Sequence, residues 1–328
     1  MAATTGVLLA VVLALGYYYR DTLMFALVMN APGLILGDPI EQELGIVTTP
    51  DGIRIAYATS GEGPPIVQVL GFGTSLGFQK DHESPLYDIT FLLAMSSRDH
   101  LFVRYDGRGF GLSDRDVDDF SLQARVSELE AVVDVLGLER FGLYAASAGG
   151  PVGIAFTAQH PERVTRLVLA GAFVSMNWQT NEQRDYWERM IALFENNWQR
   201  TAVTDMLADL LLYPQGNDLE RRIFGALLRR SADGNVVAGL FRSRLQIDSR
   251  ERAKSIRVPT LVIQARDDAL IDMKAGRDLA ALVPGSQFEI VEGGHMASSG
   301  STPAVRRRIL DFFEARNEDS INRDGAVE

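Results

Sequence analysis

The sequence predicts an α/β fold in which helices flank a mostly parallel sheet of eight strands. Two observations lead to this prediction. From about residue 41 onward, short apolar runs rich in β-branched residues alternate with helical patterns. The later runs are continuously apolar, as is typical of parallel strands that are covered on both faces. We therefore expect right-handed crossovers between neighbouring parallel strands.

The eight predicted strands are separated by turns or by helices. The turn formed by Pro50, Asp51 and Gly52 joins the first two strands as a hairpin. The strands are predicted at residues 45–49, 53–58, 66–70, 101–105, 141–145, 166–169, 260–264 and 288–291.

Three of the intervening helices carry recognisable end signals. Ser121 can cap a helix that is ended by Gly137. A second helix runs from the region of residue 147 to His160, before Pro161, and a third begins at Pro303. The apolar stripe of the first helix consists of Leu122, Val126, Leu129, Val133 and Leu136.

One interval interrupts the alternation of strands and helices. Between residues 173 and 257 the sequence shows only helical patterns. A helical insertion in an α/β core is expected over the carboxyl ends of the strands, where such sheets bind ligands. We predict a core of residues 38–173 and 258–316, a helical cap of residues 174–257, a hydrophobic N-terminal segment of residues 1–37 and a polar tail of residues 317–328.

Two features of the insertion each allow two interpretations. Trp187, Ile191, Phe194 and Trp198 recur at helical spacing, which fits either a lid over an apolar pocket or packing of the cap on the core. A set of arginines either binds an anionic substrate or forms a solvated face that pairs with nearby acids. These arginines are Arg221, Arg222, Arg229, Arg230, Arg242 and Arg244.

The N-terminal segment predicts a membrane anchor. Residues 2–19 carry no charged side chain, and as a helix they reach about 27 Å, close to the roughly 30 Å of a hydrocarbon core. The segment ends in three tyrosines at residues 17–19 and Arg20 follows, which suits a membrane interface and favours a cytoplasmic location for the rest of the chain. The alternatives are a signal peptide or a packed helix, with a soluble or exported protein.

Composition excludes several classes of function. The formal net charge of -11 over 328 residues repels phosphate backbones, so we expect no nucleic-acid partner. The absence of cysteine excludes disulfides, thiolate zinc sites and a cysteine nucleophile. No phosphate-binding loop or metal-ligand spacing is found, so we expect neither a cofactor nor a metal.

A nucleophile is predicted immediately after the strand at residues 141–145. Ala145, Ser147 and Gly149 form a small-x-Ser-x-small pattern between this strand and the next helix. Such a sharp turn would expose Ser147 above the sheet and direct the N–H of Ala148 toward a developing oxyanion. The alternative is a small-residue helix start that only packs against the sheet.

Two further segments resemble the α/β-hydrolase fold family. Residues 105–114, YDGRGFGLSD, resemble the loop after the fourth strand of these enzymes, and residues 160–164, HPERV, resemble the end of the helix after the nucleophile. The resemblance covers roughly residues 41–316, and the insertion matches the family's cap domain in position only. It implies a hydrolase. A serine at the elbow argues against the reactions of this fold that use an aspartate nucleophile.

The resemblance also indicates the partners of Ser147. The family's Gly-x-x-Asp loop falls on residues 265–268, so that Asp268 matches the catalytic acid, and Asp267 is the alternative. His295 lies between the last strand and the last helix, in the order Ser…Asp…His that is found in this fold. The other three histidines have structural explanations: His160 ends a helix, His100 precedes a strand, and His82 is a loop residue, with a place in the pocket as the alternative for His82.

The second oxyanion donor is expected in the loop after the third strand, at the N–H of Phe72. Leu70 stands where the family usually has histidine, and Ala145 and Ala265 each replace a usual glycine. The expected function is hydrolysis of a small, partly apolar carboxylic ester or similar carbonyl compound through an acyl-enzyme. The alternatives are carbon–carbon hydrolysis, lactonase, aminopeptidase or haloperoxidase activity, or a ligand sensor without turnover.

Overall fold

The computed structural model describes residues 42–72, 76, 99–176, 181–214 and 216–315. Within these ranges eight strands form one sheet in the order β1-β2-β4-β3-β5-β6-β7-β8. β2 pairs antiparallel with both β1 and β4, and all other neighbours are parallel. The predicted sheet is therefore confirmed. The strands are β1 (Glu43–Thr48), β2 (Arg54–Ser60), β3 (Pro65–Val69), β4 (Leu101–Tyr105), β5 (Phe141–Ala146), β6 (Val164–Ala170), β7 (Thr260–Ala265) and β8 (Gln287–Val291).

The strand order determines where a ligand can bind. From β3 the chain moves to β4 on one side, and it then returns to place β5 on the other side of β3. Ligands of open α/β sheets bind at the carboxyl ends of the strands where the direction of winding changes. The loops that leave β3 and β5 at this point contain Phe72 and Ser147.

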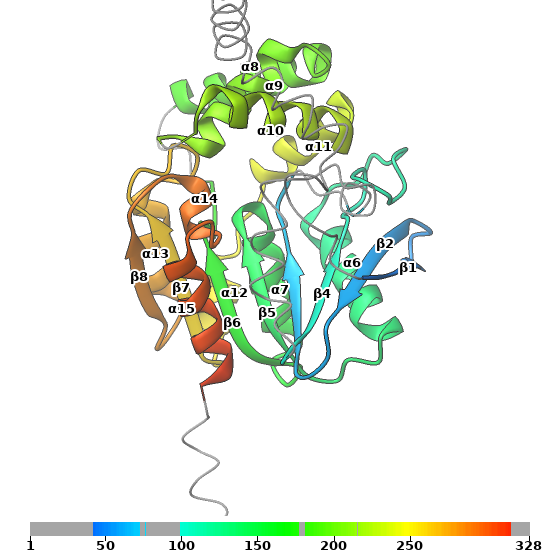
Figure 1. Ribbon diagram of the computed structural model, residues 1–328, viewed down its shortest axis with the longest axis vertical. Coiled ribbons are helices and arrows are strands. Elements are labelled where there is room, and N and C mark those ends of the chain that lie inside the picture. Colours follow the sequence, from blue (N-terminus) through cyan, green and yellow to red (C-terminus); the bar gives the residue numbers. More distant parts are fainter. Residues whose placement is uncertain (1–41, 73–75, 77–98, 177–180, 215, 316–328) are drawn as a thin grey trace, which may run out of the picture.

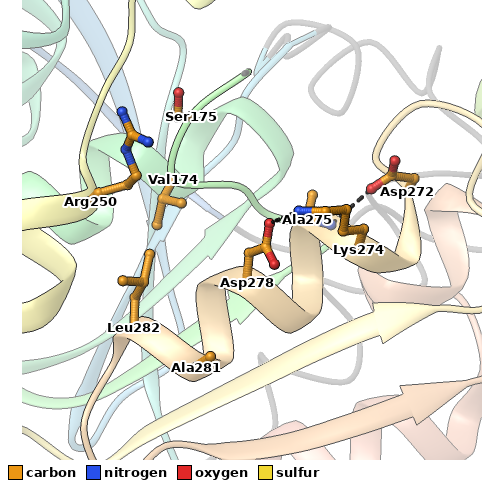
Figure 2. A pocket seen from close by; sticks show the side chains of 9 residues that line it. All are labelled: Val174, Ser175, Arg250, Asp272, Lys274, Ala275, Asp278, Ala281 and Leu282. Carbon is orange, nitrogen blue, oxygen red and sulfur yellow. Dashed lines mark hydrogen bonds and ion pairs between the residues drawn. The ribbon is translucent and has the colours of Figure 1, made fainter. Parts of the chain in front are cut away.

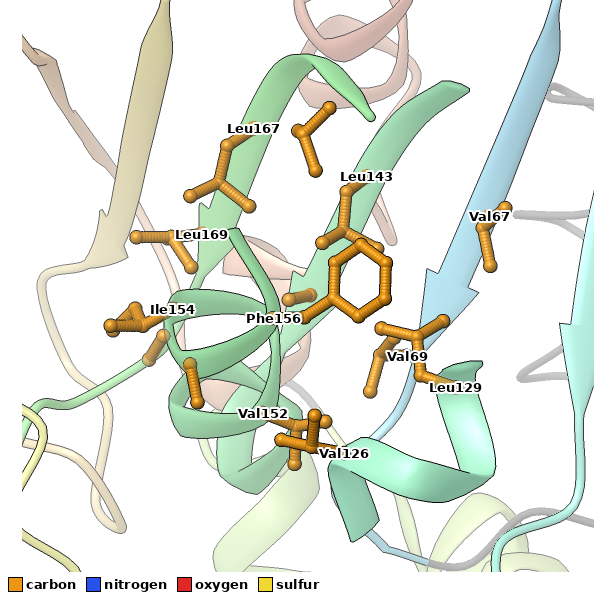
Figure 3. Packing of buried hydrophobic residues seen from close by; sticks show 14 of the residues in the cluster. Val67, Val69, Val126, Leu129, Leu143, Val152, Ile154, Phe156, Leu167 and Leu169 are labelled. Atoms are coloured by element: carbon orange, nitrogen blue, oxygen red, sulfur yellow. The ribbon is translucent and has the colours of Figure 1, made fainter. Parts of the chain in front are cut away.

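Helices cover both faces of the sheet. On one face lie α6 (Leu122–Val135), α7 (Gly150–Gln159), α12 (Arg250–Ser255) and α13 (Met273–Leu282), and α15 (Pro303–Glu314) covers the other. Ser121 accepts a hydrogen bond from the backbone N–H of Ala124, so it caps α6 as predicted. Figure 3 shows how α6 and α7 interlock with the strands, through Val67, Val69, Leu143, Leu167 and Leu169 on the sheet and Val126, Leu129, Val152, Ile154 and Phe156 on the helices.

Four helices gather across one end of the sheet (Figure 1): α8 (Asn181–Asn197), α9 (Thr201–Leu212), α10 (Asp218–Ser231) and α11 (Gly234–Arg244). The aromatic stripe belongs to their shared core, since Ile191 and Phe194 of α8 and Trp198 just after it are buried together with Phe241 of α11. The indole N–H of Trp198 donates to the carbonyl of Ala232, at 2.9 Å. Most of the stripe therefore lies in the hydrophobic core of the cap.

The two ends of the chain lie outside the described residues. The proposed anchor at residues 2–19 and the polar tail from residue 317 both fall there, so their predicted roles stay predictions. In the ranges that the structure describes, no helix is both long and apolar enough to cross a membrane. The domain boundaries at residues 37, 173, 257 and 316 also stay predictions.

Candidate active site

Ser147 occupies a strained turn at the carboxyl end of β5. Its φ of 54° is the left-handed conformation, which no other described residue except glycine adopts. This conformation costs a residue with a side chain roughly 1–2 kcal/mol. A short 3₁₀ turn, η1 (Ser147–Gly149), follows and leads directly into α7. The strand-turn-helix arrangement expected for a nucleophile elbow is present.

Close packing explains why alanine stands at position 145. Ala145 is fully buried and faces α7, where a methyl group on Gly153 would lie 2.6 Å from its Cβ. Real Cβ atoms essentially never approach so closely. The residue without a side chain therefore stands on the helix, at Gly153, and the strand can carry alanine at position 145. On the far side of the turn, a methyl group on Gly149 would lie 2.3 Å from the carbonyl oxygen of Val69. The elbow is therefore pressed between β3 and α7.

His295 and Asp268 form a buried pair. Nδ1 of His295 lies 2.7 Å from Oδ2 of Asp268, and both side chains are almost inaccessible to solvent. His295 begins the short helix α14 (His295–Ser298), and Gly171 at the end of β6 lies against its ring. Because the carboxylate accepts at Nδ1, that nitrogen carries the proton and Nε2 is available as a base. The structure thus brings together two of the three predicted catalytic side chains at the strand ends near Ser147.

The loop after β7 holds Asp268 as a carboxylate. Burial, the strongest influence, raises the pKa of Asp268, but His295 and the backbone N–H groups of Ile271 and Leu270 outweigh it. The pKa therefore lies below its ordinary value. Both N–H groups donate to Oδ1 at 2.9 Å. The neighbouring Asp267 is exposed, so Asp268 is the acid that the geometry joins to His295.

The loop after β3 lies directly on the elbow. A methyl group on Gly71 would come within 2.3 Å of the backbone nitrogen of Ala148, so only glycine fits there. This contact places the predicted donor segments, at Phe72 and Ala148, side by side. The Phe72 ring packs into the cap, 5.8 Å from Phe110 and 6.0 Å from Trp198 between centroids. The cap therefore contacts the loop that carries the predicted second oxyanion donor.

The side chain of Arg125, on α6, connects the two loops by hydrogen bonds. Its guanidinium donates to the carbonyl of Ala148 at 3.0 Å and to the carbonyl of Leu70 at 3.4 Å. Arg125 is buried, and sequence reasoning missed it. A signal was present, because a charged residue at 125 falls on the apolar stripe with Leu122 and Leu129. The loop in which Leu70 replaces the usual histidine thus has a different support.

The fold and this geometry agree with a known family. The family model described as the alpha/beta hydrolase fold matches residues 64–300. The chain belongs to this family. The resemblance and the fold inferred from sequence are thereby confirmed.

Named relatives of this hydrolase-fold chain support its class. It is 28% identical over 296 residues to the 2-hydroxymuconate semialdehyde hydrolase of Pseudomonas putida. The aligned region covers 87% of this chain and 97% of that protein. It is 24% identical over 245 residues to the pyrrolizixenacetamide deacetylase of Xenorhabdus hominickii, covering 74% of this chain and 88% of the relative. These names agree with the expected enzyme class, a hydrolase.

A solved structure supports the fold alone. The enol-lactonase of Burkholderia xenovorans LB400 superposes with a TM-score of 0.70 at 20% identity, over 83% of this chain and 100% of that one. At this identity the likeness concerns the fold and says nothing about the substrate of this chain.

Other polar features of this hydrolase lie apart from the elbow. His160 pairs with Glu130 at 2.9 Å, His100 is buried before β4, and His82 lies outside the described residues. Among the side chains that the structure describes, no group of three or more acids and histidines could hold a metal ion. A hollow of about 440 Å³ between Val174 and α13 contains cations that are already paired with acids, as Figure 2 shows for Lys274 and Asp278.

Replacing Arg125 with methionine should lower kcat about tenfold to a hundredfold and change KM less. The reason is that an oxyanion donor contributes about 10²–10³ in kcat, and the loss of the guanidinium loosens both donor segments without removing them. Steady-state kinetics on one ester would measure this. Arg140→Met, which removes an exposed arginine, is the control. An equal loss of kcat in both variants, or an effect on KM alone, would contradict a positioning role.

Proposed function

We propose that this chain is a serine hydrolase that cleaves a carboxylic ester or a similar carbonyl compound through Ser147, His295 and Asp268. The observation that carries the proposal is the buried His295–Asp268 hydrogen bond at the strand ends beside a serine in a left-handed turn. A positioned base, an acid that orients it and a partly accessible nucleophile are the parts that acyl transfer requires.

The mechanism follows from these positions. Oγ of Ser147 attacks the carbonyl carbon while Nε2 of His295 takes the hydroxyl proton, and Asp268 stabilises the imidazolium. The N–H groups of Phe72 and Ala148 hold the oxyanion. The imidazolium then gives its proton to the leaving group, and the acyl-enzyme remains. Water reverses the sequence: His295 takes its proton, the hydroxide equivalent attacks the acyl carbon, and Ser147 regains a proton.

A second candidate is carbon–carbon hydrolysis of a carbonyl compound by the same residues. It is favoured by the 28% identical relative named 2-hydroxymuconate semialdehyde hydrolase. A panel of esters, lactones, amides and 2-hydroxymuconate semialdehyde, each assayed with wild type and Ser147→Ala, separates the candidates. Turnover of at least one compound that disappears in Ser147→Ala supports the proposal. Saturable binding without turnover of any compound favours the ligand sensor instead.

Membrane attachment is a separate proposal. It rests on the uncharged residues 2–19, which lie outside the described ranges, and it places the hydrolase domain in the cytoplasm. Co-sedimentation of the full chain with membranes, before and after a salt wash, tests it. A chain that stays in the supernatant would favour the soluble or exported alternative.

A further inference from the structure

The structure separates the six arginines that the sequence analysis singled out in the insertion into two groups. Five are exposed or half-buried, and three of these pair with acids in the cap: Arg221 with Asp209 at 2.5 Å, Arg229 with Asp205 at 3.6 Å and Arg242 with Glu195 at 2.5 Å. The sixth, Arg244, is only 5% exposed.

Arg244 lies where the cap meets the core. It is the last residue of α11, and its guanidinium carbon lies 4.7 Å from the ring centroid of Phe241 and 5.3 Å from that of Phe173. Phe241 belongs to the cap, whereas Phe173 follows β6. Two aromatic faces thus hold the cation, an interaction that contributes most where water is excluded.

No acid among the described residues forms an ion pair with Arg244. Its buried Nε also has no hydrogen-bond partner. Burial lowers the pKa of Arg244 to about 10, as does the positive charge of Arg125, while Asp268 opposes the shift. The group is therefore still a cation at neutral pH. A buried charge without a partner is costly, and proteins normally pair such groups or leave them facing a ligand.

The neighbours of Arg244 are those of the candidate active site. The ring of Phe241 lies 5.8 Å from that of Phe72 in the oxyanion loop, and Phe173 packs in one cluster with Ala148. Two charged groups of the site influence the pKa of Arg244. They are Asp268, which contacts the proposed base, and Arg125, which supports the two loops. Arg244 is thus the buried cation that the cap contributes beside the elbow.

We propose that Arg244 binds a carboxylate group of the substrate, so that this hydrolase acts on an anionic carbonyl compound whose acid is held between cap and core. The planar guanidinium can donate two parallel hydrogen bonds to a carboxylate, and low local polarity strengthens them. The aromatic neighbours exclude water from the pair. This inference rests on the proposed function, because it names the substrate class of the same site.

The test compares esters that differ only in a terminal acid. The para-nitrophenyl monoesters of succinate, glutarate and adipate are matched with the butyrate, valerate and hexanoate esters of equal acyl length. We expect wild type to prefer at least one acid ester to its neutral counterpart. Arg244→Gln should lower kcat/KM for that acid ester about tenfold to a hundredfold, the usual contribution of a charge-assisted hydrogen bond, and change the neutral ester less than about threefold.

Arg242→Gln is the matched control, since Arg242 lies on the same helix but is exposed and paired with Glu195. It should leave both ester series unchanged. Equal losses on acid and neutral esters in Arg244→Gln, or a wild type without preference for any acid ester, would overturn the inference. Arg244→Lys, which keeps the charge without the planar fork, should give an intermediate preference and serves if the glutamine variant does not fold.

A measurement without turnover separates this inference from the proposed function. Succinate, glutarate or adipate should raise the melting temperature of wild type and of Ser147→Ala, but not that of Arg244→Gln. If Ser147→Ala still hydrolyses the esters, the proposed function fails while carboxylate binding can still stand. If the esters are cleaved through Ser147 but no diacid stabilises the protein, the inference about Arg244 fails alone.

Discussion

Replacing His295 with alanine should lower kcat on the order of 10⁴- to 10⁶-fold and change KM far less. In the proposed mechanism Nε2 of His295 removes the hydroxyl proton of Ser147 and protonates the leaving group, so the variant loses both steps. Losses of this size are typical when the base of a serine triad is removed, because its members act as a unit. Steady-state kinetics with a good ester substrate would measure the change.

His160→Ala is the matched control. His160 also contacts a carboxylate, that of Glu130, but it caps the carboxyl end of α7, opposite the end that joins the elbow. It should change kcat less than about threefold, as expected of a surface substitution. A His295→Ala variant that keeps more than about a tenth of wild-type kcat would show that another group is the base.

Replacing Asp268 with asparagine should lower kcat on the order of 10⁴-fold. The amide can donate to Nδ1 of His295, which would favour the tautomer with its proton on Nε2, and that tautomer cannot act as a base. Asp267→Asn provides a close control, because the adjacent side chain is exposed and only Asp268 contacts the imidazole. If Asp267→Asn caused the larger loss, the assignment of the acid would be wrong.

The acid also predicts a dependence of stability on pH. Because the folded pKa of Asp268 lies below its unfolded value of about 3.8, ionisation of Asp268 stabilises the fold above that value. This contribution should disappear as the pH falls through the folded pKa. Denaturant unfolding of wild type and Asp268→Asn should therefore give a stability difference that is constant near neutral pH and narrows below about pH 4. A difference that grows on acidification would contradict the assigned direction.

Local patterns were sufficient to predict the sheet and the elbow. Each strand was marked by its own apolar run, and the small residues around Ser147 were readable because a sharp turn limits side-chain size locally. The preference for Asp268 over Asp267 needed the family resemblance, since two adjacent acids differ only in which one faces the core.

Contacts between distant segments were beyond the sequence patterns. Ala145 departs from the usual glycine because Gly153 on α7 supplies the space, and this pairing depends on how the helix docks on the strand. Arg125 carried a visible signal, a charge on an apolar stripe, but its partners in two loops did not. Arg242 and Arg244 could not be distinguished in the sequence, because the buried face of α11 is decided by packing in the cap.

The most direct test of the account is covalent labelling of Ser147. The full-length protein is treated with a fluorophosphonate, and its mass and peptide map are determined by mass spectrometry. The account predicts one adduct on the peptide that contains Ser147, no adduct in Ser147→Ala, and a strongly slowed reaction in His295→Ala. An adduct on a different residue, or labelling of Ser147→Ala at the wild-type rate, would contradict acyl transfer through Ser147.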